Sequence, residues 1–211
     1  YYRDLDIEKA ITTTRFTAGG VTYIREAFTS FPDQLLIIRL TASQKKSISF
    51  TAKYTTPYKE HIMHSISPRK ELQLNGKAND HEGIEGKIKF TALTRIENQG
   101  GSLEVLSDST LQVKNANSVT LYVSIGTNFL NYKDVSGNAE QAALNYLKQA
   151  NKNYAKSKTA HINTYQNYFN RVSLDLGSND QSLKTTDTRV KEFGTTFDPQ
   201  MAALYFQFGR Y

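Results

Sequence analysis

The sequence predicts a mainly β protein, in which an antiparallel β-sandwich is followed by a helical linker and by an apolar helix that is cut short. Three observations support this fold class. Residues 1–127 contain short alternating apolar segments, with turn signals about every eight to twelve residues. Residues 138–172 contain neither glycine nor proline and have a helical period. Apolar side chains dominate the segment after Asp198 and Pro199.

The first predicted strands form a hairpin. In "FTAGGVTYIREAF", Ala18, Gly19 and Gly20 supply the turn, and alternation begins at Val21. The continuous apolar run over residues 35–38 suits a strand better than a helix because it is short. A run of this kind predicts a strand that is buried on both faces.

Further strands are predicted in "KSISFTAKY", "GKIKFTALTRI" and "SLEVL". "STLQVKNANSVTLYVSIGT" contains two more, joined by residues 115–117. In the second of these, one face is expected to carry Val119, Leu121, Val123 and Ile125, and the other Thr120, Tyr122 and Ser124. Residues 58–80 are less regular, and we expect one or two strands and a long loop there. About eight to ten strands without intervening helices predict a sandwich, although a barrel has similar spacing.

Helices replace strands after Gly137. Asn138 is a candidate N-cap, and Glu140 lies favourably in the first turn. We expect two helices with a break near residues 151–157, where polar residues are dense. Their apolar stripe is formed by Ala143, Leu147, Ala150, Tyr154, His161, Tyr165, Tyr168 or Phe169, and Val172. A short strand over 172–176, a polar linker over 178–187 and a short helix or turn over 186–194 follow.

The last predicted helix begins with Asp198 as N-cap and Pro199 in the first turn. Apolar side chains then point in nearly every direction, which is typical of a helix inside a large structure. Burying four of these side chains is worth about 1.5–3 kcal/mol each; they are Leu204, Tyr205, Phe206 and Phe208. We therefore expect a fragment that is cut where a helical domain begins. The alternative is that the helix packs on the sandwich or on a second copy through residues 199–211.

Composition limits the classes of function. The chain has 211 residues, no cysteine and a formal net charge of +6. Disulfides and thiolate metal sites are therefore excluded. No stretch reaches the roughly 18 apolar residues that a membrane helix needs. Basic residues are spread along the chain, and the densest group, Lys148, Lys152, Lys156 and Lys158, has the spacing of a solvated helix face. A nucleic-acid partner is not expected, because the hypothesis of a basic nucleic-acid-binding domain rests on charge alone.

Several residues have side chains suited to chemistry. His61 and His64 lie three apart, but in a strand or loop context without an evident third metal ligand. Asp80, His81 and Glu82 form a polar loop, which is either an ordinary turn or part of the rim of a neighbouring active site. His161 falls on the apolar stripe and is interpreted as a packing residue.

The aromatic residues allow two interpretations. Tyr54, Tyr58 and Tyr132 are candidate sugar-stacking rings, although aromatic residues also fill sandwich cores and domain interfaces. No Ser/His/Asp triad or glycine-rich phosphate loop has a local signature. We assign no catalytic, cofactor-binding or metal-binding residue to this chain and expect no cofactor.

Four segments, taken in order, resemble glycoside hydrolase family 95, the α-L-fucosidases, some of which act on α-L-galactosides. They are "VTYIREAFTSFPDQLLIIRLTA", "HINTYQNYFNRVSLDLG", "LKTTDTRV" and "DPQMAALYFQFGRY". The most specific pieces are "REAFTSFPDQLLIIRL" and "LYFQFGRY". Thr164 is a departure, because the family often has an acidic residue at this position. The resemblance spans nearly the whole chain.

The resemblance implies an N-terminal β-supersandwich, a helical linker and an (α/α)6 barrel that carries the active site. It implies that residues 1–127 are the later part of the sandwich, incomplete at its start. Residues 128–177 are then the linker with its return strand, and residues 178–211 lead into the first barrel helix. The resemblance also implies an enzyme that cleaves terminal α-L-fucosyl residues with inversion. In the family a Glu is the acid and an Asn assisted by an Asp activates the water, and these residues are expected beyond this chain.

The first hypothesis is therefore a non-catalytic, inactive portion of a larger periplasmic or secreted hydrolase, whose partners are the barrel and, through the parent protein, a fucosylated glycan. The alternative is a free-standing carbohydrate-binding sandwich.

Overall fold

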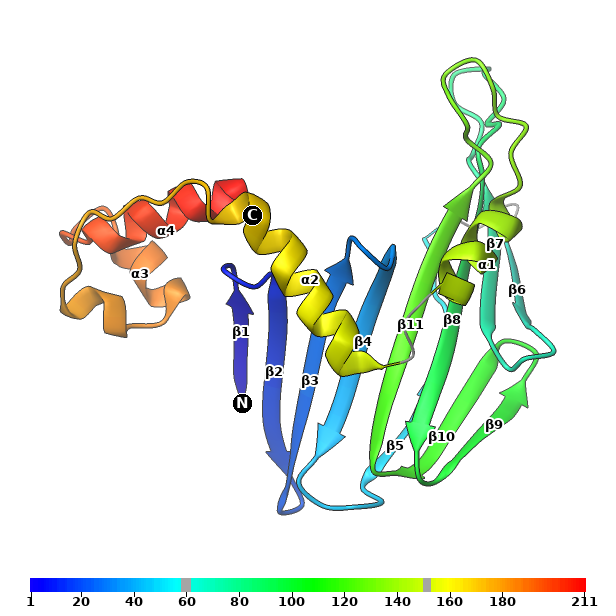
Figure 1. Ribbon diagram of the computed structural model, residues 1–211, viewed down its shortest axis with the longest axis horizontal. Coiled ribbons are helices and arrows are strands. Elements are labelled where there is room, and N and C mark those ends of the chain that lie inside the picture. Colours follow the sequence, from blue (N-terminus) through cyan, green and yellow to red (C-terminus); the bar gives the residue numbers. More distant parts are fainter. Residues whose placement is uncertain (58–61, 150–152) are drawn as a thin grey trace.

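The computed structural model describes residues 1–57, 62–149 and 153–211 (Figure 1). Within these ranges it contains eleven strands and four α-helices. The strands are β1 (Tyr2–Asp6), β2 (Ile11–Ala18), β3 (Val21–Ser30), β4 (Leu35–Ala42), β5 (Ile48–Ala52), β6 (Met63–Ile66), β7 (Leu72–Lys77), β8 (Lys89–Gln99), β9 (Ser102–Ser107), β10 (Thr110–Ala116) and β11 (Ser118–Thr127). The helices are α1 (Ala139–Gln149), α2 (Tyr154–Phe169), α3 (Thr186–Glu192) and α4 (Pro199–Arg210). A 3-10 turn spans Asp180–Leu183.

The strands form two antiparallel sheets. The larger sheet has eight strands in the order β1-β2-β3-β4-β11-β8-β7-β6, and the smaller has the order β5-β10-β9. The predicted antiparallel sandwich is confirmed, and so is the hairpin around Gly19 and Gly20, where Ala18 pairs with Val21. The strand number exceeds the eight to ten predicted. Strand β1 is missing from the prediction because it is an edge strand with a charged sequence, YRDLD, and no apolar alternation.

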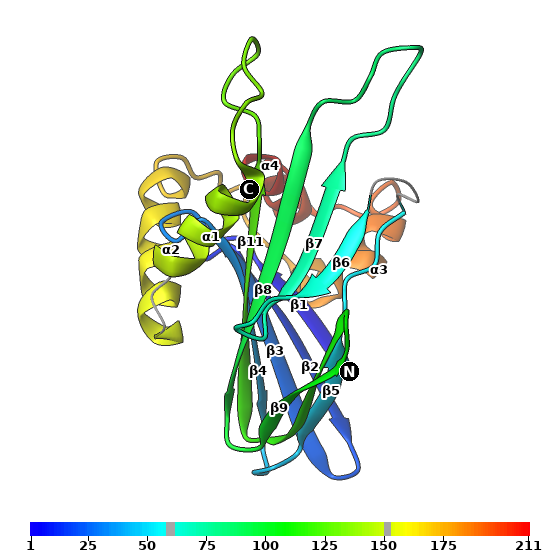
Figure 2. The same cartoon turned by 90° about the vertical axis from the view of Figure 1, so that its right-hand side faces the viewer.

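Each face of the large sheet has its own hydrophobic core. On one face, helices α1 and α2 pack on a cluster that includes Phe28, Ile37 and Tyr122 from the sheet and Ala143 and Leu147 from α1. On the other face, the small sheet contributes to a second cluster. The buried members of this cluster are Ile48, Leu72, Ile96, Leu111, Val113, Ala116 and Val119. Figure 2 shows the small sheet on the side of the large sheet opposite to α1 and α2.

One of the strand predictions is corrected, and another is confirmed. Strand β4 is not buried on both faces: Leu35 and Ile37 are buried, but 37% of Leu36 is exposed. The helices cover the face of β4 that carries Leu35 and Ile37. On the opposite face, the small sheet lies mainly over β11, β8 and β7. The two predicted faces of β11 are confirmed, because Val119 and Leu121 pack in the cluster with the small sheet and Tyr122 packs in the cluster with the helices. Ile125 is exposed near the end of the strand.

The two predicted linker helices are confirmed. In α1, the Asn138 side chain accepts a hydrogen bond from the Gln141 amide at 2.9 Å, as expected of an N-cap. Helix α2 has its own N-cap, Asn153, whose side chain accepts from the Lys156 amide. The expected break near 151–157 includes residues 151 and 152, which lie outside the described residues, as does Ala150 of the predicted stripe.

The C-terminal segment departs from the prediction at one point. Residues 172–176 form no strand, because none of the described strands lies beside them to pair with, and Val172, Leu174 and Leu176 are exposed. Helices α3 and α4 form as predicted. They pack together at one end of the molecule, away from the strands (Figure 1).

Candidate functional site: the linker and the C-terminal helix pair

Helix α2 is held to the turn between β1 and β2 by hydrogen bonds to main-chain carbonyls. The His161 imidazole Nε2 lies 3.0 Å from the Lys9 carbonyl and 3.1 Å from the Ala10 carbonyl. The Tyr165 hydroxyl donates to the Ile7 carbonyl at 2.7 Å, and the Gln166 amide donates to the Glu8 carbonyl at 3.1 Å. These three side chains lie on one face of α2, four and five residues apart. The carbonyls of a tight turn are therefore satisfied by a helix that follows about 150 residues later.

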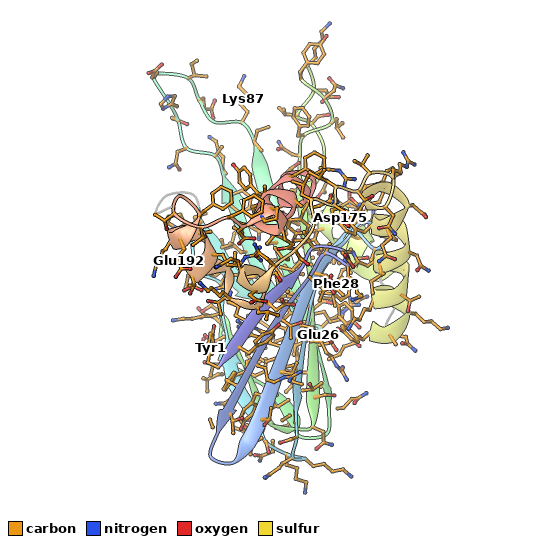
Figure 3. All side chains as sticks on the ribbon, turned by 90° about the vertical axis from the view of Figure 1, so that its left-hand side faces the viewer. Tyr1, Glu26, Phe28, Lys87, Asp175 and Glu192 are labelled. Atoms are coloured by element: carbon orange, nitrogen blue, oxygen red, sulfur yellow. The ribbon has the colours of Figure 1, made fainter. Side chains whose placement is uncertain are left out.

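The start of α2 is fixed by an ionic network on the same sheet face. The Glu26 carboxylate accepts from the Tyr154 hydroxyl at 2.8 Å and from the Lys158 ammonium at 2.6 Å. Burial raises the pKa of Glu26, but the bonds from Lys158 and Tyr154 and the charge of Arg39 outweigh burial and lower it. Burial, followed by the bond to Glu26, raises the pKa of Tyr154. In Figure 3, Glu26 and Phe28 lie along one strand facing α2.

Helices α3 and α4 are joined by a buried ion pair. The Arg189 guanidinium donates to both carboxylate oxygens of Asp198, at 2.8 and 2.9 Å. Asp198 also accepts from the Met201 amide at 3.0 Å, which is the N-cap bond predicted for this helix. The Arg189 hydrogen bond is the main cause that lowers the pKa of Asp198. One carboxylate therefore begins α4 and ties it to α3.

The far side of α4 is apolar and open. Tyr205, Phe206 and Phe208 are 75%, 42% and 52% exposed, and only Ala203 is buried among the residues of α4. The prediction that this helix lacks enclosing partners is confirmed for these side chains. A hollow of about 470 Å³ lies between α3 and α4, lined by Val190, Phe193, Met201, Ala202 and Tyr205.

A second apolar hollow of about 620 Å³ lies where the β1–β2 and β3–β4 turns meet α2 and the chain end. Aromatic side chains dominate it, among them Phe28, Phe31, Tyr168 and Tyr211. Thr164, the departure from the family pattern, also lines it. Both hollows therefore flank the segment that connects the sheet to α4.

The histidine predictions have separate outcomes. His161 is 4% exposed and stacks on Phe28, with ring centroids 4.7 Å apart, so its interpretation as a packing residue is confirmed. His61 lies outside the described residues, and His64 is half-buried in β6. Within the described ranges, no three or more histidine and acidic side chains gather in a way that suits a metal ion.

The polar loop with Asp80, His81 and Glu82 lies between β7 and β8. It projects beyond the end of the sheet, as does the loop between β11 and α1 (Figure 2). Asn128 ties their bases together, because its side-chain amide donates to the carbonyls of Lys87 at 3.1 Å and of Val135 at 2.7 Å. His81 is exposed and belongs to a tight turn closed by bonds to Ile84.

The candidate sugar-binding tyrosines do not come together. Tyr54 is partly buried and bonds to the Thr94 hydroxyl at 2.5 Å. Tyr132 is 83% exposed on the loop after β11, and Tyr58 lies outside the described residues. In the lysine group, Lys148 and Lys156 are exposed, Lys158 pairs with Glu26, and Lys152 lies outside the described residues. Among the described helices, none is long and apolar enough to cross a membrane.

Sequence reasoning missed the residues that join these elements. Glu26 and Tyr154 are 128 positions apart, and Arg210 and Phe169 are 41 apart. No local pattern in a single sequence reports such pairs. Arg189 and Asp198 are closer in sequence, nine positions apart, and the residues between them contain the end of α3 and lead to Asp198, the N-cap of α4.

Two family models match the chain. Residues 1–132 match the N-terminal domain of glycosyl hydrolase family 65, and residues 153–211 match the catalytic domain of glycosyl hydrolase family 95. The second match begins at the N-cap of α2 and therefore includes the helix that contacts the sheet.

Curated relatives align over the whole chain. "Alpha-L-fucosidase 2" of Arabidopsis thaliana is 29% identical over 241 residues, and "Probable alpha-fucosidase A" of Aspergillus niger is 26% identical over 228 residues. A second "Probable alpha-fucosidase A", from Aspergillus oryzae, is 24% identical. Each alignment covers 100% of this chain, which spans 28% of the length of the first two relatives and 31% of the third.

A solved structure shows the same fold. "Putative kojibiose phosphorylase from human microbiome" superposes with a TM-score of 0.55 at 14% identity, over 79% of this chain and 24% of that one. At this identity the likeness concerns the fold alone. The predicted resemblance to family 95 is confirmed by the match of residues 153–211 and by the relatives, and through residues 1–132 the chain belongs to the family of the glycosyl hydrolase family 65 N-terminal domain.

Proposed function

We propose that this chain is the sandwich and linker portion of an α-L-fucosidase-like hydrolase that removes terminal α-L-fucosyl or α-L-galactosyl residues with inversion. The observation that carries the proposal is the alignment of its full length with relatives named as α-fucosidases. The exposed apolar face of α4 supports it, because a catalytic domain that covers this face removes Tyr205, Phe206 and Phe208 from water.

The chemistry of this chain supports a non-catalytic role. Inverting hydrolysis needs an acid and a base about 6.5–9.5 Å apart, on either side of the glycosidic bond. The two buried carboxylates among the described residues, Glu71 and Asp198, are each bound to an arginine. Glu26 is held by Lys158 and Tyr154. Carboxylates paired in this way hold the fold together, which supports a structural role for them.

The domain boundaries follow from the same proposal. Residues 1–127 are the later part of the sandwich, residues 128–177 the linker, and residues 178–211 lead into the first helix of the barrel. Leu36 and Ile125, exposed on the face of the large sheet away from the helices, are then covered by the rest of the sandwich. A periplasmic or secreted location stays a prediction.

The test is fucose release from 2′-fucosyllactose and from an aryl α-L-fucoside. The 211-residue chain is expected to release none, whereas a longer protein that also carries the remaining catalytic sequence is expected to release β-L-fucose first, as followed by NMR. Fucose release by the pure 211-residue chain contradicts the non-catalytic role. An inactive longer protein contradicts the proposed activity.

A free-standing carbohydrate-binding module is the alternative, and the exposed ring of Tyr132 is the observation that favours it. Titration of the 211-residue chain with fucosylated oligosaccharides, followed by calorimetry, separates the two functions. Binding that is lost in Tyr132→Ala and kept in Tyr2→Ala, a second exposed tyrosine, supports the module.

A further inference from the structure

The end of α4 returns to the end of α2, and Arg210 makes the contact. One guanidinium nitrogen, Nη1, donates to the Val172 carbonyl at 2.6 Å, and Nη2 donates to the Phe169 carbonyl at 2.6 Å. The guanidinium carbon lies 4.9 Å from the centre of the Phe169 ring. A second side-chain contact joins Nη1 to Gln207. A single side chain of α4 thus reaches two carbonyls at and beyond the end of α2.

Helix α2 provides a reason for this contact. The last carbonyls of a helix carry partial negative charge and have no partner within the helix. Helix α2 has no basic residue in its last turn. The planar fork of an arginine holds donors on two nitrogens in a fixed arrangement, whereas the donors of a lysine share one nitrogen. Arg210 therefore supplies from α4 the cation that the last turn of α2 lacks.

Rings pack around the same contact. Phe169 is buried and stacks on Tyr165, with centroids 5.1 Å apart. Tyr165 meets the Tyr211 ring edge-on at 6.3 Å, and its hydroxyl bonds to the β1–β2 turn. The contacts thus run without interruption from the sheet through α2 to the last turn of α4.

We infer that Arg210 is a positioning residue that sets the direction of α4 relative to the large sheet. The joint consists of Tyr165, Phe169, Val172, Arg210 and Tyr211. The inference about direction rests on these contacts alone. Its consequence for catalysis rests on the proposed function, since α4 belongs to the segment that matches the family 95 catalytic domain.

Arg171 is the matched control. It is also an arginine at the end of α2, but its Nε donates to the Asn167 carbonyl of the same helix at 2.8 Å, and its guanidinium lies 4.9 Å from the Tyr168 ring centre. Both interactions stay within one element. Arg171→Ala removes the same charge from the same region without breaking a contact to α4.

The direction of α4 is measured by the distance between two spin labels in the 211-residue chain. The chain has no cysteine, so Lys45→Cys and Tyr205→Cys, at exposed positions in the β4–β5 turn and on α4, introduce the only thiols. We expect one narrow distance distribution in the parent chain. Arg210→Ala is expected to broaden it by about twofold, because α4 then samples several directions.

The control variants distinguish a change in the direction of α4 from unfolding of α4. Arg171→Ala is expected to keep the narrow distribution, and Arg210→Lys is expected to give an intermediate width, because an ammonium lacks the planar fork that fixes both carbonyls at once. An unchanged distribution in Arg210→Ala overturns the inference. Loss of α4 helicity in far-UV circular dichroism also overturns it, because the inference requires the helix to persist in a changed direction.

A second measurement extends the test to the longer hydrolase. There Arg210→Ala is expected to lower kcat by about tenfold to a hundredfold while KM stays within about twofold, because misplaced catalytic groups lose alignment. A change in KM alone contradicts a positioning role. If the longer protein has no fucosidase activity at all, the proposed function fails. The distance measurement still tests whether Arg210 sets the direction of α4.

Discussion

Gly126 offers a direct test of how α1 packs on the sheet. It lies in β11 beneath this helix, and a Cβ at position 126 would lie 2.3 Å from the Ala139 carbonyl oxygen and 2.6 Å from the Ala143 nitrogen. Both are main-chain atoms, which cannot turn aside as the end of a flexible side chain can. Gly126→Ala therefore requires α1 to lift away from β11.

The size of the effect follows from that displacement. Relief of the clash needs a movement of about 1 Å, and a gap of this size forfeits a quarter to a half of the dispersion energy of the contacts it opens. The affected contacts include those of Ala143 and Leu147, both fully buried. We expect a loss of about 2 kcal/mol in the free energy of unfolding, within the usual range of about 1–3 kcal/mol for an overpacked core. The melting temperature then falls by about 4–8 °C.

Urea unfolding followed by tyrosine fluorescence measures this loss. Gly194→Ala is the control, because a Cβ at position 194 meets no atom within 4 Å and its φ is not positive. This control is expected to be neutral or to gain about 0.4–1 kcal/mol. A Gly126→Ala variant that unfolds within about 0.5 kcal/mol of the parent chain refutes the close packing of α1 on β11.

Three further predictions concern α1 and α4. Leu147→Ala removes a fully buried side chain and is expected to cost about 2–5 kcal/mol in the free energy of unfolding, measured by thermal circular dichroism. The pKa of Asp198 is lowered in the folded state by Arg189, so its contribution to stability is complete above the unfolded pKa of about 3.9 and is lost as the pH falls through the folded value. Helicity of α4 is therefore expected to fall in acid below about pH 4, and Asp198→Asn is expected to remove this step. If residues 199–211 mediate self-association, Phe208→Ser is expected to weaken dimerisation by about tenfold in sedimentation experiments.

Each of these three has a contrary outcome. An unchanged melting temperature in Leu147→Ala contradicts the α1 core. An acid transition that persists in Asp198→Asn assigns the titration to another carboxylate. If the parent chain sediments as a monomer at all concentrations, self-association through α4 is contradicted.

Local signals predicted much of this structure. Gly19 and Gly20 placed the first hairpin, Asn138 placed the start of α1, and Asp198 with Pro199 placed the start of α4. Each of these signals acts over a few residues, through a turn conformation or a single capping bond. A single sequence therefore reports them well.

Predictions that depended on tertiary neighbours were less successful. Leu36 was expected to be buried because its run is apolar, but the small sheet packs near the other end of β4, against Leu40 and Ala42, and leaves Leu36 partly exposed. Residues 172–176 have a strand-like sequence without a neighbouring strand to pair with. Arg210 carries no local signal of its role, because its two partners lie 38 and 41 residues earlier in the chain.

The bonds from α2 to the β1–β2 turn also bear on the order of assembly during synthesis. His161, Tyr165 and Gln166 are translated long after the turn to which they bond, and strands β2 to β11 are all made in between. Docking of this helix therefore signals that the preceding sheet is already in place. Any helical domain that continues from α4 would then be built on a finished platform, and an early defect in β1 or β2 would first appear as a linker that fails to attach.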